Sequence, residues 1–175
     1  MYATAANTLA RLAKGTDGQF LSLASGVPAW ATINQSWTQI GSTVTPSGAS
    51  VTITDIPTTY QQLALRLSRV EFDTSDTLQL KVSTTNGVSY HTAKTISAAT
   101  GSGSNYLSGF VIIDYANSPL AYERAIIPNT ITETGTVYND VSVYAVTGVI
   151  KAIQLVAAGG ANFDNTPGRV ELWGI

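Results

Sequence analysis

The sequence predicts an all-β protein, an antiparallel two-sheet sandwich with jelly-roll-like connections that follows a short extended N-terminal segment. The first observation is a period of two, because short runs alternate apolar and polar side chains as strands with one buried face do. The second is that clusters of Gly, Pro, Asn and Ser separate these runs. The third is that about eight to ten short strands, with no convincing helix among them, favour a sandwich.

The chain begins with a segment, residues 1–33, that lacks this alternation. Leu9 and Leu12 lie one helical turn apart, with Thr8 as a cap and Gly15 as a stop, so a helix of about two turns is expected here. A helix that short is marginal by itself in water. The segment therefore needs contacts beyond its own to become ordered.

Residues 15–30, GTDGQFLSLASGVPAW, predict one small hairpin. Turn chemistry occurs at Thr16–Gly18 and again at Ser25–Gly26, because Gly tolerates positive φ and Asp hydrogen-bonds its own backbone. The residue before Pro28 is held in an extended conformation. The large apolar side chains of this hairpin are Phe20, Leu21, Leu23 and Trp30. An isolated hairpin cannot bury them, which indicates an interface.

The head domain is expected over residues 34–175. We expect strands at 37–40, 50–54, 62–72, 77–83, 90–96, 107–115, 121–127, 137–146, 151–157 and 169–173. The clearest is 62–72, in which the leucines at 63, 65 and 67 share one face while Arg66 and Ser68 share the other. Residues 110–113, FVII, are apolar on both sides, which predicts a central strand covered on both faces.

Composition excludes several classes of protein. Hydrophobic residues make up 44% of the 175, enough for a core, whereas charged residues make up only 11% and the net charge is −2. The basic residues are scattered, so nucleic acid is not an expected partner. No apolar run approaches the length of a membrane helix, and no classical secretion signal is evident. The absence of cysteine excludes disulfides and zinc-thiolate sites.

Catalytic chemistry finds little support, and we expect no enzyme, cofactor or metal. His91 is the one histidine and lies without a G-x-S-x-G motif nearby. Asp73 and Asp76 have the oxygens for a calcium loop, but Asx turns explain the same residues. Asp114 and Glu123 flank a turn and would meet across a hairpin, which leaves glycoside hydrolysis as an open alternative to a pair of surface charges.

A loop-borne glycan site is the remaining candidate. Sugar sites tend to place an aromatic ring beside amide and carboxylate groups. Such combinations occur at several predicted strand ends: Asn105 with Tyr106, Tyr115 with Asn117, Tyr138 with Asn139, and Phe163 with Asn162 and Asp164.

The N-terminal segment resembles a recurrent element of bacteriophage tail-fibre and virion surface proteins, including head-fibre and decoration proteins. That element runs as L-x-x-G-T-x-G-Q-x-L followed by G-x-P-x-W, and residues 12–21 and 26–30 match it. The resemblance implies that the segment lies near the threefold axis of a homotrimer or anchors to another virion protein. The implied interface residues are Leu9, Leu12, Phe20, Leu21, Leu23, Pro28 and Trp30.

The resemblance further implies a virion structural protein, made in the host cytoplasm and placed on the tail or capsid surface. As a short trimeric fibre or spike, its head would mediate adhesion to host glycans. A short segment before the head, without a long shaft, keeps a second role open, that of a capsid decoration or cement protein. A polysaccharide-degrading sandwich enzyme is a further alternative, and a monomer whose N-terminal residues fold back onto the sandwich is the alternative to a trimer.

Overall fold

The computed structural model describes residues 2–5, 8–32, 36–100, 106–114, 116–118, 122–132, 134–164 and 168–175. The chain divides into two compact units, an N-terminal unit, Met1–Ser36, and a head, Trp37–Ile175. This division lies close to the joint expected after residue 33. Within the described ranges, no helix has the length and apolar character needed to cross a membrane.

The N-terminal unit consists of two antiparallel hairpins. Strands β1 (Tyr2–Ala5) and β2 (Thr8–Ala10) form the first, and β3 (Gln19–Ala24) and β4 (Val27–Thr32) form the second. The hairpin expected over residues 15–30 is confirmed. The helix expected from Thr8 is wrong, because residues 8–10 pair with β1 instead and strand pairing replaces a helix too short to nucleate.

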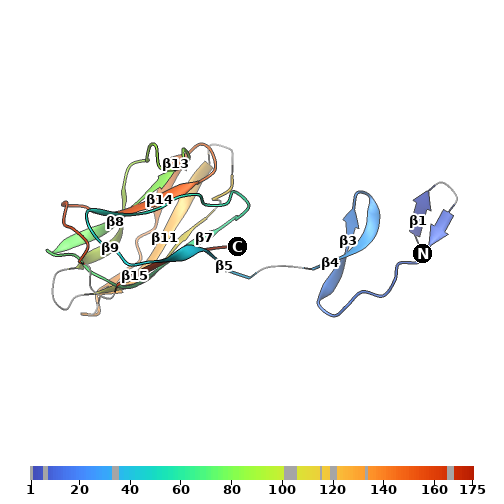
Figure 1. The fold of residues 1–175 in the computed structure, drawn as a ribbon, viewed down its shortest axis with the longest axis horizontal. Coiled ribbons are helices and arrows are strands. Elements are labelled where there is room, and N and C mark those ends of the chain that lie inside the picture. The colour runs from blue at the N-terminus through green and yellow to red at the C-terminus, as the bar shows by residue number, and fades with distance from the viewer. Residues whose placement is uncertain are drawn as a thin grey trace. The chain divides into compact units, whose positions relative to one another are not determined.

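The described residues of the head form eleven strands. They are β5 (Thr38–Val44), β6 (Ser50–Ile53), β7 (Leu63–Val70), β8 (Asp76–Ser83), β9 (Lys94–Thr100), β10 (Leu107–Ile113), β11 (Tyr122–Thr132), β12 (Val137–Tyr138), β13 (Ser142–Val146), β14 (Ala152–Ala157) and β15 (Arg169–Gly174). Figure 1 shows how they are arranged.

These strands form two sheets, so the predicted all-β antiparallel class is confirmed. The large sheet has the order β12-β11-β10-β7-β15-β5, with β13 also pairing β11, and the small sheet has the order β6-β14-β8-β9. The first and last strands of the head, β5 and β15, pair with each other, and the next strands inward, β6 and β14, also pair with each other. The strand pairs are therefore nested along the chain. The inner pairs β7–β10 and β8–β9 continue this nested order, and β11, β12 and β13 extend the large sheet beyond β10. The narrower expectation of jelly-roll-like connections stays a prediction.

Several expected strands have different limits in the structure; those expected at 37–40 and 121–127 continue to Val44 and Thr132. The strand expected at 90–96 begins only at Lys94, because residues 90–93 are irregular after the turn at Asn86–Gly87, and among them the backbone N–H of His91 donates to the carbonyl of Val82 (2.9 Å). The strand expected at 137–146 is split into β12 and β13 by Asn139 and Asp140, which favour turns over extended pairing. Both pieces still pair with β11.

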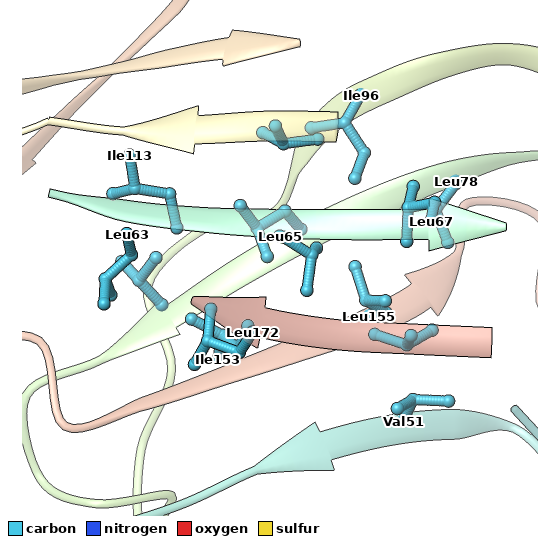
Figure 2. Packing of buried hydrophobic residues seen from close by; sticks show 14 of the residues in the cluster. Val51, Leu63, Leu65, Leu67, Leu78, Ile96, Ile113, Ile153, Leu155 and Leu172 are labelled. Atoms are coloured by element: carbon cyan, nitrogen blue, oxygen red, sulfur yellow. The ribbon is translucent and has the colours of Figure 1, made fainter. Parts of the chain in front are cut away.

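The core lies between the two sheets. Leu63, Leu65 and Leu67 of β7 are buried as their alternation predicts, and Figure 2 shows them beside side chains of the small sheet such as Leu78 and Leu155. Each buried leucine contributes about 1.5–3 kcal/mol relative to an exposed one. This core makes the head a scaffold on which outward-facing residues are held in place.

Strand β10 is central in its sheet but covered on one face only. Val111 and Ile113 are fully buried, whereas Phe110 is 48% exposed and Ile112 is half-buried. The expectation that residues 110–113 are covered on both faces is therefore wrong. The physical reason is that each sheet of an antiparallel sandwich packs against the other sheet on one face only. Alternate residues of β10, Phe110 and Ile112, therefore face outward although they are apolar.

Candidate binding surfaces

The motif GTDGQ closes the turn that leads into β3. The carbonyl of Thr16 accepts the backbone N–H of Gln19 (3.2 Å), while the Gln19 side-chain oxygen accepts the N–H of Thr16 (2.9 Å). Gly18 has φ of 84°, a conformation that favours glycine. The glutamine and the second glycine of the motif therefore have a local structural role.

The tryptophan of the motif folds back onto the start of the same stretch. Its indole Nε1–H donates to the carbonyl of Ala13 (2.6 Å), and its ring lies over Gly15. A Cβ at Gly15 would lie 2.6 Å from Trp30 Cδ2, so only glycine leaves room for the ring. At the far end, Ser25 and Gly26 form a two-residue hairpin turn in which both φ angles are positive.

The hairpin β3–β4 exposes its large apolar side chains. Phe20 is 43% exposed, Leu21 59%, Leu23 73% and Trp30 39%. The strand register pairs Leu21 with Trp30 and Leu23 with Pro28, which places these four side chains on one face. We call Leu21, Leu23, Trp30 and the half-buried Pro28 of this face, together with the exposed Phe20 of the opposite face, the hairpin surface.

The other two residues of the expected interface lie before this hairpin. Leu12 is half-buried, and Leu9 belongs to β2 although its side chain lies outside the described part of the structure. The N-terminal unit thus has a folded backbone and an apolar surface without a core of its own among its described residues.

A second apolar surface lies on the outer face of the large sheet, the face opposite the small sheet. The register aligns Trp173, Ala64, Ile112 and Ile127 across four neighbouring strands. A groove of about 530 Å³ runs over this face, and its aromatic lining is Trp37, Phe110 and Trp173. Trp37 is 39% exposed and Phe110 48%, so two of these rings are open to a ligand.

Arginines line a depression next to this groove. It has a volume of about 310 Å³ and is formed by Arg66, Ser68, Arg69, Arg169 and Glu171. Arg66 donates to Glu171 across the strand pair (3.2 Å) and forms an ion pair with it. We call this hollow the arginine depression.

A β-bulge brings the third arginine to the outer face. The register between β7 and β10 shifts between Leu107 and Gly109, so Ser68 and Arg69 are both accommodated opposite Ser108. Arg69 has φ of 52°, and its backbone N–H donates to the Ser108 hydroxyl (3.1 Å). Its guanidinium lies 4.4 Å from the ring centroid of Tyr106, at the edge of a third hollow of about 280 Å³.

The expected glycan-site residues do not converge. Tyr106 contacts Arg69 on the outer face, whereas Tyr138 is in register with Thr130, whose side chain is buried, so Tyr138 belongs to the inner side. Burial raises the pKa of the Tyr138 hydroxyl, and the charge of Asp140 raises it further. Asn139, beside it, is exposed.

Phe163 is not available to stack on a sugar. Its ring is 3% exposed and packs on Phe72 at a centroid distance of 4.9 Å. The backbone N–H of Asp164 donates to the carbonyl of Glu71 (3.1 Å), and the Asn162 amide donates to a carboxylate oxygen of Asp73 (3.2 Å). This cluster therefore stabilises the loop between β14 and β15.

Asn117 lies at the other end of β7 from this cluster. The preceding residue, Ala116, donates its N–H to the carbonyl of Gln61 just before β7 begins, while Phe163 bridges Phe72 just after β7 ends. Eight residues of strand separate the two ends by about 26 Å. Asn105 and Tyr115 lie outside the described residues.

The carboxylates considered for calcium serve the same loop. Both oxygens of Asp76 accept the N–H of Gly159 (2.9 and 2.8 Å), and one also accepts the N–H of Ala161 (3.2 Å). Desolvation acts to raise the pKa of Asp76, but hydrogen bonds from Gly159, Thr77 and Ala161 outweigh it and hold the pKa below its usual value. Hydrogen bonds from Asn162 lower the pKa of Asp73 as well.

No constellation for hydrolysis or metal binding is evident among the described side chains. Asp114 accepts a hydrogen bond from Gln62 (2.8 Å), and the side chains of Glu123 and Arg124 lie outside the description. Groups of three or more His, Asp or Glu residues suited to hold a metal ion are absent from the described part of the chain. The two surfaces above are thus the candidate functional sites.

Fold and surfaces together define an antiparallel β-sandwich protein with two candidate binding surfaces. Comparison of the chain with protein-family models, curated proteins and solved structures finds no match.

Proposed function

We propose that this chain is a bacteriophage virion structural protein whose N-terminal unit forms a homotrimer and anchors it to the particle, while the head mediates adhesion. The observation that carries the proposal is the hairpin surface. Four large apolar side chains of one short hairpin are 39–73% exposed, and apolar patches of this kind usually mark interfaces. Two further copies of the same hairpin, or another virion protein, would cover them.

The motif that resembles phage fibre and decoration proteins gains a physical explanation from the local geometry. Gly15 makes room for Trp30, Gln19 closes the turn, and Gly26 supplies a positive φ at the hairpin tip. These contacts leave the leucines of β3 free to point outward. The motif is therefore suited to presenting apolar side chains to a partner.

The head supports adhesion through its outer face. Exposed aromatic rings in an open groove suit the faces of sugar rings, and arginines and serines beside them suit polar substituents. A weak site repeated three times gains avidity through effective concentration. We propose binding to bacterial surface glycans without catalysis, and release of sugars from such glycans by the protein would contradict this.

Solution mass tests the proposal. Light scattering on the full chain is expected to give three times the chain mass of 18.4 kDa, whereas a shortened chain beginning at Trp37 gives one. Leu23→Asp, on the hairpin surface, should dissociate the trimer. Val88→Asp is the matched control, because Val88 is even more exposed but lies on the head. A full chain that is monomeric contradicts the trimer, and pull-down with particle proteins then tests anchoring alone.

A wide apolar area beside the groove favours capsid decoration as the second candidate. Ile127 and Ile131 of β11, with Val137 and Val143 of the neighbouring strands, are 40–55% exposed. A flat aliphatic area suits a protein partner better than a sugar. Co-sedimentation of the head with empty shells of the encoding phage, abolished by Ile131→Asp, would favour decoration over adhesion.

A further inference from the structure

We infer that the arginine depression binds the oxyanion of an acidic saccharide, a carboxylate or a phosphate carried on a sugar. The inference deepens the proposed adhesion and rests on it for the saccharide part of the ligand. The anion site itself rests on geometry and charge within the head.

The depression is a built feature of two adjacent strands. The register places Glu171 opposite Arg66 and Arg169 opposite Ser68, all facing outward from β15 and β7. The bulge adds Arg69 to the same face beside Ser68. Three guanidinium groups and one hydroxyl therefore surround a single hollow of about 310 Å³.

The described carboxylates of the head do not balance the positive charge in this hollow. Three of the nine basic residues of the chain line it, together with one carboxylate. Glu171 uses one oxygen for Arg66 (3.2 Å) and the other for the hydroxyl of Thr43 (3.1 Å). Arg69 and Arg169 have no ion-pair partner among the described residues. Like charges at close range repel, so an external anion between them is favourable.

Arg69 is held ready to bind. Its guanidinium is fixed over the Tyr106 ring at 4.4 Å, and its backbone is fixed by the Ser108 hydroxyl. A guanidinium presents a planar fork of donors that matches the two oxygens of a carboxylate or phosphate. Because the fork is already oriented, less side-chain entropy is lost on binding.

The neighbouring hollows indicate that the anion is carried by a sugar. Arg66 and Ser68 line both the depression and the groove that contains Phe110, so an anionic group and a sugar-ring face are accommodated side by side. A nucleic acid is disfavoured, because the chain has a net charge of −2 and a single hollow cannot neutralise a run of phosphates. An acidic sugar residue within a surface glycan combines the required groups.

Titration calorimetry on the full chain tests the inference with three probes: a short oligogalacturonate for carboxylate, a glycerol phosphate oligomer for phosphate, and maltotriose as the neutral control. The test variant is Arg69→Asn with Arg169→Gln, since asparagine tolerates a positive φ. The matched control is Lys81→Gln with Lys151→Gln, which removes the same charge elsewhere on the head. Thermal melting verifies that both variants are folded.

We expect one acidic probe to bind more tightly than maltotriose, to weaken with added salt, and to lose about tenfold or more in affinity in the arginine variant only. Which acidic probe binds distinguishes a carboxylated from a phosphorylated glycan. Equal affinity in the arginine and lysine variants, or no preference for either acidic probe, would overturn the inference. Light scattering measures trimer formation, which does not involve these arginines. Failure of the proposed trimer and failure of the anion site are therefore distinguishable.

Discussion

Gly15 lies directly beneath the indole ring of Trp30, fifteen residues further along the chain, and a methyl group on Gly15 would approach the ring to 2.6 Å. The same indole donates to the carbonyl of Ala13. The glycine and the tryptophan of the motif are therefore two halves of one contact. This contact holds residues 13–15 against the hairpin β3–β4, whose other large apolar side chains are exposed.

Gly15→Ala is expected to displace Trp30 and to destabilise the N-terminal unit by about 1–3 kcal/mol, the usual cost of forcing an extra methyl group into a filled space. Tryptophan fluorescence and limited proteolysis between residues 10 and 30 measure the loss. Gly26→Asn is the control, because nothing lies within 4 Å of a Cβ there and asparagine tolerates the positive φ. Equal protease resistance of Gly15→Ala and the unaltered chain would contradict the packing role.

Gly109 is required by the close approach of β11 in the large sheet. A Cβ there would overlap the carbonyl oxygen of Asn129 and lie 2.8 Å from Cα of Thr130, both backbone atoms of β11 that cannot move aside, and its φ is 135°. Gly109→Ala is expected to cost about 3 kcal/mol or more in urea unfolding. Gly41→Ala, with positive φ but open space, should cost only about 1–2 kcal/mol. Equal losses of unfolding free energy in the two variants would show that backbone strain, and not crowding by β11, determines the cost of Gly109→Ala.

Asp76 makes the stability of the head depend on acid pH. Its folded pKa is lowered, so the folded state binds fewer protons than the unfolded chain, and the stabilisation is present above about pH 4 and is lost as pH falls below it. Asp76→Asn should lower stability at neutral pH by about 1 kcal/mol and flatten this acid dependence. Asp17→Asn, in the N-terminal unit, is the control. A head whose urea midpoint shows the same acid slope with and without Asp76 would refute the assignment.

Substitutions of Phe110 and Phe72 are expected to affect different properties of the head, ligand binding in the first case and stability in the second. Phe72 is fully buried, so Phe72→Ala should destabilise the head by about 3–5 kcal/mol. Phe110 is 48% exposed on the outer face, so Phe110→Ala should cost less than about 1 kcal/mol while weakening adhesion to glycan-bearing cells. Loss of stability comparable to that of Phe72→Ala would mean that Phe110 is a core residue.

Alternation along the chain was sufficient to predict the class of the head and most of its strands. The leucines at 63, 65 and 67 identified the buried face of β7, and the turn residues between runs identified its neighbours. Periodicity could not tell a strand covered twice from one that exposes an apolar face, because FVII has the same pattern in either case. The error at Phe110 concealed the groove.

The arginine depression was beyond the reach of pattern reasoning. Arg66 and Arg169 come from strands about a hundred residues apart in sequence, and only the pairing of β7 with β15 brings them together. Arg69 reaches the same face through a bulge, and a strict period of two assigns it to the core instead. Phe163 was misjudged for the opposite reason, because its turn-like surroundings gave no sign that its ring packs on Phe72.

The third guanidinium of the arginine depression, that of Arg69, faces outward because β7 has one residue more than the stretch of β10 that it pairs with. A chain one residue shorter in β7 would pair with β10 in regular register, keep Leu67 and Val70 in the core, and present only Arg66 and Arg169 outward. Deletion of one residue here would therefore remove one guanidinium from the proposed anion site while leaving the architecture unchanged. In the proposed site, the number of arginines facing the ligand depends on strand spacing as much as on residue type.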